Sequence, residues 1–305
     1  MLLLVGPTAV GKTGLSLPLA EKLAGEIVAA DSRQVYRYMD IGTAKPTREE
    51  QQRIPHHFID IRDPDQYYSA GEYGREARRC IEDLLAQGRQ PVVVGGSGFY
   101  ISALVDGLFA PKISDPEVKI RWRQRIDEQG LPAVFHYLQQ VDPITAARLH
   151  ANDAQRMVRA LEVYELTGRP ISDFHKGQEE PARFTPVFVG LTRPRHELCR
   201  RIEQRVDAML AAGLVEEVKN LQERGYGPGL NALQTVGYQE VFQYLAGQID
   251  YRRMTDLIKI HSRRYAKRQM TWFRRDSRIQ WLDIEKESIE SAVRTIYQVQ
   301  EKCCR

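Results

Sequence analysis

The chain has 305 residues, of which 42% are hydrophobic and 28% charged, the balance of an ordinary globular protein with one large domain or two smaller ones. The opening run MLLLV is too short for a secretory core or a membrane span, so we expect no membrane contact. Four cysteines without C-x-x-C spacing predict a reducing cytoplasm and neither a disulfide nor a zinc site. The formal net charge of +4 is small, but the charge is unevenly placed along the chain.

A predicted strand from Leu2 to Val5 leads into GPTAVGKT, which matches the phosphate-binding pattern G-x-x-x-x-G-K-[ST]. A predicted helix with Pro18 as a kink follows it, so the context is strand, loop and helix. In this loop the backbone N–H groups and the helix N-terminus bind anionic oxygens, Lys12 adds a cation, and the Thr13 hydroxyl can bind Mg²⁺. The motif predicts a phosphate site, and the family resemblance given below implies that the phosphate is a diphosphate. The residues of this site are Gly6, Pro7, Thr8, Ala9, Val10, Gly11, Lys12 and Thr13, with Thr13 as the metal ligand.

Two further apolar runs end in small or polar residues, EIVAADSRQ with Asp31 and PVVVGGSGFY with Ser97, and a helix is predicted between them at 70–88. Strands that alternate with helices predict an α/β fold, a parallel sheet of the P-loop NTPase type. Ligands of such sheets bind beyond the carboxyl ends of the strands. We therefore expect the P-loop, Asp31 and the segment 95–97 to meet at one site.

The region 115–184 predicts helices and no strand. Asp115 before a proline and Gly130 bound one helix, in which Val118, Trp122 and Ile126 share a face. We interpret this region as a mostly helical insertion domain, which divides the core into residues 1–114 and 185–305.

After the insertion, strands are predicted at 185–193 and 278–284 and helices between them. Residues 252–278 contain ten lysines and arginines but only two acids. A basic stripe of this kind indicates a polyanion partner, although charge runs are more often solvated helix faces.

The acid that a hydrolytic P-loop protein places at the end of a second strand is absent after Val94, whereas Asp31 follows the strand at 26–30. Asp31 could bind a metal or act as a base beside the phosphate. The pattern leaves open a small-molecule or nucleoside kinase and a nucleotide-regulated RNA-binding protein.

Several stretches, in order from Gly6 to Arg275, resemble the bacterial form of the tRNA dimethylallyltransferase (tRNA isopentenyltransferase) family. The P-loop is shared by many families, so the more specific stretches carry the resemblance: DSRQVYRYMDIGTAKPT, PHHFIDIRDPDQYYSAGEY, VVVGGSGFYISAL, DPEVK, NDAQRMVRALEVYELTG, RIEQRVDAML, ALQTVGYQE and KRQMTWFRR. Eukaryotic members commonly add a Cys/His zinc finger, and this chain shows no such spacing.

The resemblance implies transfer of a dimethylallyl group from dimethylallyl diphosphate to N6 of the adenosine 3′ to the anticodon of tRNA, with diphosphate as the leaving group and Mg²⁺ as cofactor. It implies Asp31 as the base and Lys12 and Thr13 as catalytic residues; the alternative for Asp31 is a Mg²⁺ ligand. Arg201 and Arg205 lie one helical turn apart and could reach the diphosphate, although a surface ion-pair role is favoured slightly.

The same resemblance implies contacts with the tRNA anticodon stem-loop. Without it, Gln155 and Arg159 would be an ordinary polar helix face. We expect the protein to act as a monomer. The implied tRNA-binding residues are Asp31, Ser32, Arg33, Gln34, Ser97, Lys119, Gln155, Arg156, Met157, Val158, Arg159, Gln234, Thr235, Val236, Gly237, Tyr238, Gln239, Lys267, Arg268, Gln269, Met270, Thr271, Trp272, Phe273 and Arg274.

Overall fold

The computed structural model describes residues 1–107, 113–174, 184–285 and 287–304. The chain forms two compact units: Met1–Asp106 together with Ala182–Arg305, and Gly107–Pro181. The sequence predicted the helical region at 115–184, which begins eight residues later and ends three residues later than the second unit. The first junction lies next to residues outside the described ranges, and the second lies among them.

The first unit is built on a six-stranded sheet in which every pair of neighbouring strands is parallel. The spatial order is β3-β2-β4-β1-β5-β6, so β1 lies between β4 and β5. This confirms the predicted parallel α/β core. The sequence did not predict the two-residue strand β3. The strands are β1 (Leu2–Val5), β2 (Gly25–Ala30), β3 (His56–His57), β4 (Gln90–Gly95), β5 (Val187–Thr192) and β6 (Gln280–Asp283).

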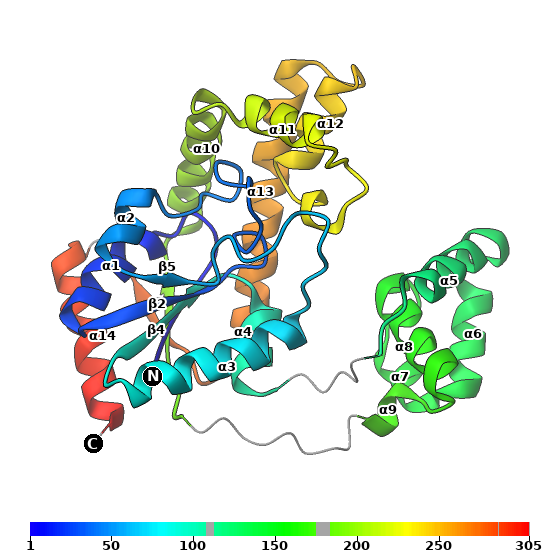
Figure 1. The fold of residues 1–305 in the computed structure, drawn as a ribbon, viewed down its shortest axis with the longest axis horizontal. Helices are drawn as coiled ribbons and strands as arrows, with labels where there is room; N and C mark the ends of the chain where they lie inside the picture. Colours follow the sequence, from blue (N-terminus) through cyan, green and yellow to red (C-terminus); the bar gives the residue numbers. More distant parts are fainter. Residues whose placement is uncertain (108–112, 175–183, 286, 305) are drawn as a thin grey trace. The chain divides into compact units, whose positions relative to one another are not determined.

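Helices cover both faces of this sheet. Helices α1 (Lys12–Lys22) and α14 (Ile289–Cys304) pack on one face, where Leu2 and Leu4 of β1 belong to the same apolar cluster as Leu15 and Ile296 (Figure 1). The alternate residues of β1, Leu3 and Val5, join the cluster that contains residues of α3 (Ala70–Ala86) and α4 (Gly98–Val105). Burial on both faces explains why these strands are continuous apolar runs.

The register of the central strands brings their carboxyl ends to one level. Val5 of β1 and Ala30 of β2 are both paired with Gly95 of β4. The segments that follow the three strands are the P-loop, Asp31 and Gly96. They therefore leave the sheet at one edge, as the sequence predicted.

The other elements of this unit include α10 and the basic helix α13, which pack against each other and both line the cavity described below. The capped helix α2 leads into β3, and its last residue, Arg53, pairs with Glu21 near the end of α1. The bounds are α2 (Arg48–Arg53), α10 (Arg195–Ala211), α11 (Leu214–Glu223), η1 (Asn231–Leu233), α12 (Tyr238–Leu245) and α13 (Tyr251–Phe273).

Part of the basic segment is neutralised by acids from other elements. Lys259 pairs with Asp207 at 2.6 Å, and Arg278 pairs with Asp106. The apparent excess of positive charge at 252–278 is therefore smaller in the structure than in the sequence, because tertiary contacts supply the missing acids. The exposed cations of this segment with no ion-pair partner among the described residues lie at the two ends of α13: Arg252 and Arg253 at its start, and Arg264, Lys267, Arg268, Arg274 and Arg275 toward and just beyond its C-terminus.

The described part of the second unit contains five helices and no strand: α5 (Pro116–Gln129), α6 (Leu131–Val141), α7 (Pro143–Arg148), α8 (Ala154–Thr167) and α9 (Ile171–Phe174). Its core includes Val118, Trp122, Met157 and Leu161. Asp115 caps α5 and Gly130 ends it, as predicted.

None of the described helices combines the length and the apolar character needed to span a membrane.

Candidate active site

The P-loop is held in its shape by glycines and by its own lysine. Gly6 has φ +150°, and a Cβ at this position would lie 2.9 Å from the carbonyl oxygen of Leu191. Gly11, at the start of α1, has φ +115°. The Lys12 ammonium donates to the carbonyl oxygens of Gly6 and Pro7, both at 2.9 Å. Helix α1 therefore begins at the cavity, beside the partly buried ammonium group of Lys12. The N–H groups of its first turn lack intrahelical partners and are available to an anion.

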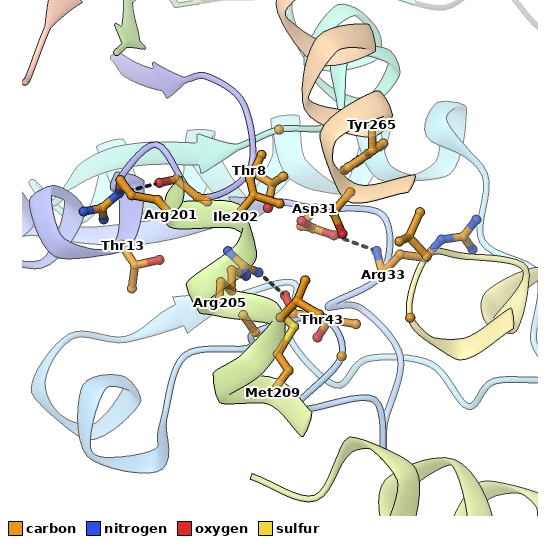
Figure 2. Close-up of a pocket in the computed structure, with 18 of the residues that line it drawn as sticks. Thr8, Thr13, Asp31, Arg33, Thr43, Arg201, Ile202, Arg205, Met209 and Tyr265 are labelled. Atoms are coloured by element: carbon orange, nitrogen blue, oxygen red, sulfur yellow. Dashed lines mark hydrogen bonds between the residues drawn. The ribbon is translucent and has the colours of Figure 1, made fainter. Parts of the chain in front are cut away.

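Three arginines bond to backbone carbonyl groups of the P-loop and of the loop 38–45. Arg193 and Arg201 donate from Nε to the carbonyl oxygens of Val10 and Ala9, each at 2.9 Å. Arg205 donates to the carbonyl oxygen of Thr43 at 3.5 Å. Figure 2 shows Arg201 and Arg205 extending from α10 toward the pocket. The surface ion-pair role favoured from the sequence is wrong, because both guanidinium groups bond to backbone carbonyl oxygens at the cavity wall.

Arg193 was missed by the sequence analysis. It directly follows β5, whose carboxyl end lies beside that of β1. Its place as the last residue of the strand predicted at 185–193 is the signal that could have revealed it.

Gln269 of α13 bridges the P-loop and the end of β4. Its side-chain oxygen accepts from the N–H of Thr8 at 2.8 Å, and its amide nitrogen donates to the carbonyl oxygen of Gly96 at 2.9 Å. Gln269 is buried, 7% exposed. Its predicted role as a tRNA contact is wrong for the side chain, because both ends of the amide are used inside the protein.

Asp31 stands at the carboxyl end of β2, on the cavity wall. One of its carboxylate oxygens accepts from the N–H of Arg33 at 2.9 Å, which fixes the carboxylate against its own loop. Figure 2 shows Asp31 close to Tyr265 of α13. The Ser97 hydroxyl accepts from the N–H of Ser32 at 2.9 Å, so its predicted contact with tRNA competes with a bond that joins the ends of β2 and β4.

These groups enclose a cavity of about 430 Å³. Its polar part is formed by the P-loop, Asp31, Arg201 and Arg205, and its apolar part by five side chains on α10, α13 and the segment before α12. A cavity with a cationic and an apolar part fits an organic phosphate ester. The apolar side chains are Ile202, Val206, Met209, Val236 and Ile258.

The electrostatics of the cavity favour an anion. Burial, together with the charge of Arg205, lowers the pKa of Lys12 from 10.5 to about 7, although Asp31 acts in the opposite direction. Burial also lowers the pKa of Arg205. For Tyr265, burial and the charge of Asp31 raise the pKa, so its hydroxyl keeps its proton. Two partly buried cations thus face one carboxylate, and a bound anion would stabilise their charged forms.

The predicted tRNA-binding residues divide by exposure. Gln155, Arg156, Gln234, Gln239, Lys267, Arg268, Thr271 and Arg274 are exposed. A second set is buried in the core or in backbone packing, so these side chains cannot contact tRNA in this structure, and the sequence prediction is corrected for them. The buried residues are Met157, Val158, Gly237, Tyr238, Gln269 and Phe273.

Three more of these residues have structural partners. Lys119 and Arg159 both pair with the fully buried carboxylate of Glu162, at 3.5 and 2.6 Å. The Gln34 amide donates to the carbonyl oxygens of Thr43 and Ala44. Their contribution to tRNA binding stays a prediction.

The side-chain oxygens at the cavity suit a metal ion that is bound largely by the phosphate oxygens of a substrate. Within the described ranges there is no group of three or more His, Cys, Asp and Glu residues that could hold a metal ion. Mg²⁺ usually keeps several waters and takes one or two protein oxygens together with substrate phosphates. Thr13 and Asp31, both at the cavity, meet that requirement.

The fold and the P-loop define an α/β protein of the P-loop NTPase type, with a cavity at the carboxyl edge of its sheet. The sequence model of the IPP transferase family matches residues 34–276, and the chain belongs to this family. It is 47% identical over 302 residues to a tRNA dimethylallyltransferase of Geobacter metallireducens and 44% identical over 298 residues to one of Carboxydothermus hydrogenoformans. Both alignments cover 97% of this chain. They cover 97% of the Geobacter metallireducens protein and 96% of the Carboxydothermus hydrogenoformans protein.

Solved structures give the same result. The fold is similar to the tRNA isopentenylpyrophosphate transferase of Bacillus halodurans, with a TM-score of 0.74 and 37% identity over 99% of this chain and 97% of the other. A eukaryotic dimethylallyltransferase acting on tRNA has a TM-score of 0.82 at 27% identity, over 99% of this chain and 79% of the other.

We predict that binding of diphosphate takes up a proton at Lys12. With a pKa of about 7, the Lys12 amine is mostly neutral at about pH 8, and a neighbouring anion raises that pKa again. Proton uptake should therefore be near zero at about pH 6 and approach one per diphosphate at about pH 8. Calorimetry in buffers of different ionisation enthalpy measures it. Lys12→Met should abolish the Lys12 contribution and Lys22→Met should retain it; equal uptake in both would contradict the assignment.

Proposed function

We propose that this protein transfers a dimethylallyl group from dimethylallyl diphosphate to N6 of the adenosine 3′ to the anticodon in tRNA and releases diphosphate. The observation that carries the proposal is the cavity in which a P-loop, a carboxylate and an apolar wall meet. The names of the relatives support it, and they favour it over a small-molecule or nucleoside kinase.

The donor site follows from the two halves of the cavity. The diphosphate binds at the P-loop, where the helix N-terminus, Lys12, Arg201 and Arg205 offset its charge. The five-carbon chain lies against the apolar side chains from α10 and α13. As the bond between C1 and the diphosphate oxygen breaks, negative charge grows on the diphosphate, and donors fixed in advance stabilise this charge more strongly than water does.

Asp31 is the proposed base. The N6 amine of adenine is a weak nucleophile, since its lone pair is delocalised into the ring. When N6 forms its bond to C1, it must lose one proton, and the Asp31 carboxylate at the cavity wall can accept it. The bond from the N–H of Arg33 holds the carboxylate in place and leaves its other oxygen for this step.

Mg²⁺ would be bound by the Thr13 hydroxyl and by oxygens of the diphosphate, with Asp31 as an alternative ligand. It would supply additional positive charge to the leaving group.

The RNA would be held by the exposed cations toward the C-terminal end of α13. Arg264, Lys267, Arg268, Arg274 and Arg275 recur at helical intervals and have no ion-pair partner among the described residues, which suits contacts with phosphates. A target base must leave its stack to enter a cavity of this kind.

The first test of the proposal is the identity of the donor. Incubation with radiolabelled dimethylallyl diphosphate, Mg²⁺ and unmodified tRNA should place label in the tRNA, whereas labelled ATP should not. Transfer from ATP to a small molecule, with no prenylated tRNA, would instead establish the kinase.

Replacement of Asp31 should reduce the turnover number without loss of substrate binding. We expect Asp31→Asn to lower kcat by roughly 10²–10⁴-fold, because proton removal from N6 is lost, and to leave tRNA affinity nearly unchanged. Single-turnover kinetics and tRNA binding measure the two effects. A variant that keeps its rate at saturating donor but loses Mg²⁺-dependent donor binding would identify Asp31 as a metal ligand.

The exposed cations should determine how salt affects tRNA binding. Removal of Lys267 and Arg268 together by alanine should flatten the log–log salt dependence by about 0.7–0.9 for each RNA phosphate that is no longer neutralised, for every tRNA alike. The control is the double variant Arg252→Ala and Arg253→Ala at the opposite end of α13, which is also exposed and should keep the native slope. Equal slopes for both variants would show that the predicted face does not bind phosphate.

A further inference from the structure

The loop 38–45 contributes Gly42, Thr43 and Ala44 to the cavity wall, and a single carboxylate, Glu217 of α11, holds the middle of this loop. We propose that Glu217 is a positioning residue: it fixes the loop that aligns Arg205 for diphosphate binding. The inference rests on the proposed function for its meaning in the reaction, but the contact itself can be tested without that reaction.

The Glu217 carboxylate accepts hydrogen bonds from three consecutive backbone N–H groups. One oxygen accepts from Asp40 at 2.9 Å and from Ile41 at 2.7 Å, and the other accepts from Gly42 at 3.1 Å. The second oxygen also accepts from the Tyr238 hydroxyl at 2.6 Å. Hydrogen bonds to a charged acceptor are among the stronger ones in proteins, so four on one side chain form a strong local constraint.

The loop needs such a constraint because its backbone is strained. Tyr38 has φ +67° and Ala44 has φ +46°, in the left-handed region that residues other than glycine rarely adopt. Between them, a Cβ on Gly42 would lie 2.4 Å from the ring of Tyr238, so this ring packs directly on the loop backbone. Strained backbone persists only where the surrounding structure enforces it.

Two carbonyl groups of the loop accept hydrogen bonds from side chains that line the cavity, so the position of the loop affects the position of these side chains. The Thr43 oxygen accepts from Gln34 at 3.2 Å and from Arg205 at 3.5 Å. The Ala44 oxygen accepts from Gln34 at 3.1 Å. The position of the Arg205 guanidinium, which would face the diphosphate, therefore depends on where the loop places the Thr43 carbonyl (Figure 2).

The ends of the loop have separate anchors. Lys45 bonds to the Tyr36 carbonyl and pairs with Asp60, and the Thr43 hydroxyl donates to the Met39 carbonyl at 2.6 Å. Loss of Glu217 should therefore loosen residues 40–42 without unfolding the unit. This separates a positioning role from a general contribution to stability.

The experiment compares Glu217→Ala with Glu216→Ala, its exposed neighbour on the same helix, and with Glu217→Gln, which keeps one oxygen acceptor. Hydrogen exchange of a peptide that covers 38–45 reports whether the loop is held. Calorimetry with inorganic diphosphate reports the effect on the P-loop site. Thermal unfolding, together with KM for dimethylallyl diphosphate and for tRNA, reports whether the effect is local.

We expect faster exchange in Glu217→Ala and about tenfold weaker diphosphate binding, with a matching rise in donor KM and an unchanged tRNA KM. Glu217→Gln should lie between this variant and the native protein, and Glu216→Ala should be native. Native exchange or native diphosphate binding in Glu217→Ala would overturn the inference. So would an equal loss of donor and tRNA binding with a lowered melting temperature.

These outcomes are distinct from failure of the proposed function. If the native protein transfers no dimethylallyl group, but Glu217→Ala still loosens the loop and weakens diphosphate binding, then the proposed reaction is wrong and the positioning role stands.

Discussion

The site depends on positive charge that the protein brings together at the carboxyl edge of its sheet. Lys12, Arg201 and Arg205 come from two helices, and Asp31 is the carboxylate that lines the cavity with them. Cations taken out of water are costly unless they are paired, and the lowered pKa of Lys12 reflects that cost. The arginine and lysine side chains donate to backbone carbonyl oxygens of the P-loop and of the loop 38–45, which offsets part of the cost of their burial. A bound anion would offset the remaining excess of positive charge, so the cations that shape the cavity also favour an anionic ligand.

A second constraint follows from the position of Gln269. This residue lies on α13, two positions after Lys267 and one after Arg268, yet its amide is bonded to the P-loop and to the end of β4. The helix that carries the exposed cations is therefore fixed to the phosphate site by two hydrogen bonds of one buried side chain. Trp272, one turn later, lies over Gly98, where a Cβ would be 2.3 Å from the indole ring. In the proposed reaction, a rigid link of this kind keeps the RNA-binding face at a constant position relative to the leaving group.

The sequence predicted the fold, and the meeting of the P-loop with Asp31 at one edge of the sheet, because both depend on local patterns. Apolar runs that end in small or polar residues indicated the buried parallel strands, and the glycine spacing of the P-loop needs only neighbouring residues. The sequence could not show which polar residues turn inward. Gln269 and Tyr238 lie in stretches that the resemblance predicted to bind tRNA, but their side chains bond to groups distant in the chain, Thr8 and Glu217. The short strand β3 was beyond reach for a similar reason, since it exists only through pairing with β2.

The basic segment 252–278 is a further case in which the sequence could not show the tertiary contacts of charged side chains. From the sequence it was one basic stripe; in the structure α10 supplies Glu203 and Asp207 to its middle, so that Arg263 and Lys259 serve the packing of two helices. Because α10 also carries Arg201 and Arg205, these ion pairs help to orient the helix that brings both arginines to the cavity. The stripe is thereby divided, and most of its exposed cations without an ion-pair partner among the described residues lie toward the C-terminal end of α13, around Gln269. Positive charge thus gathers at the P-loop cavity and at the helix end that Gln269 fixes to it. Those are the two places where the proposed reaction requires polyanions, the diphosphate of the donor and the backbone of the acceptor RNA.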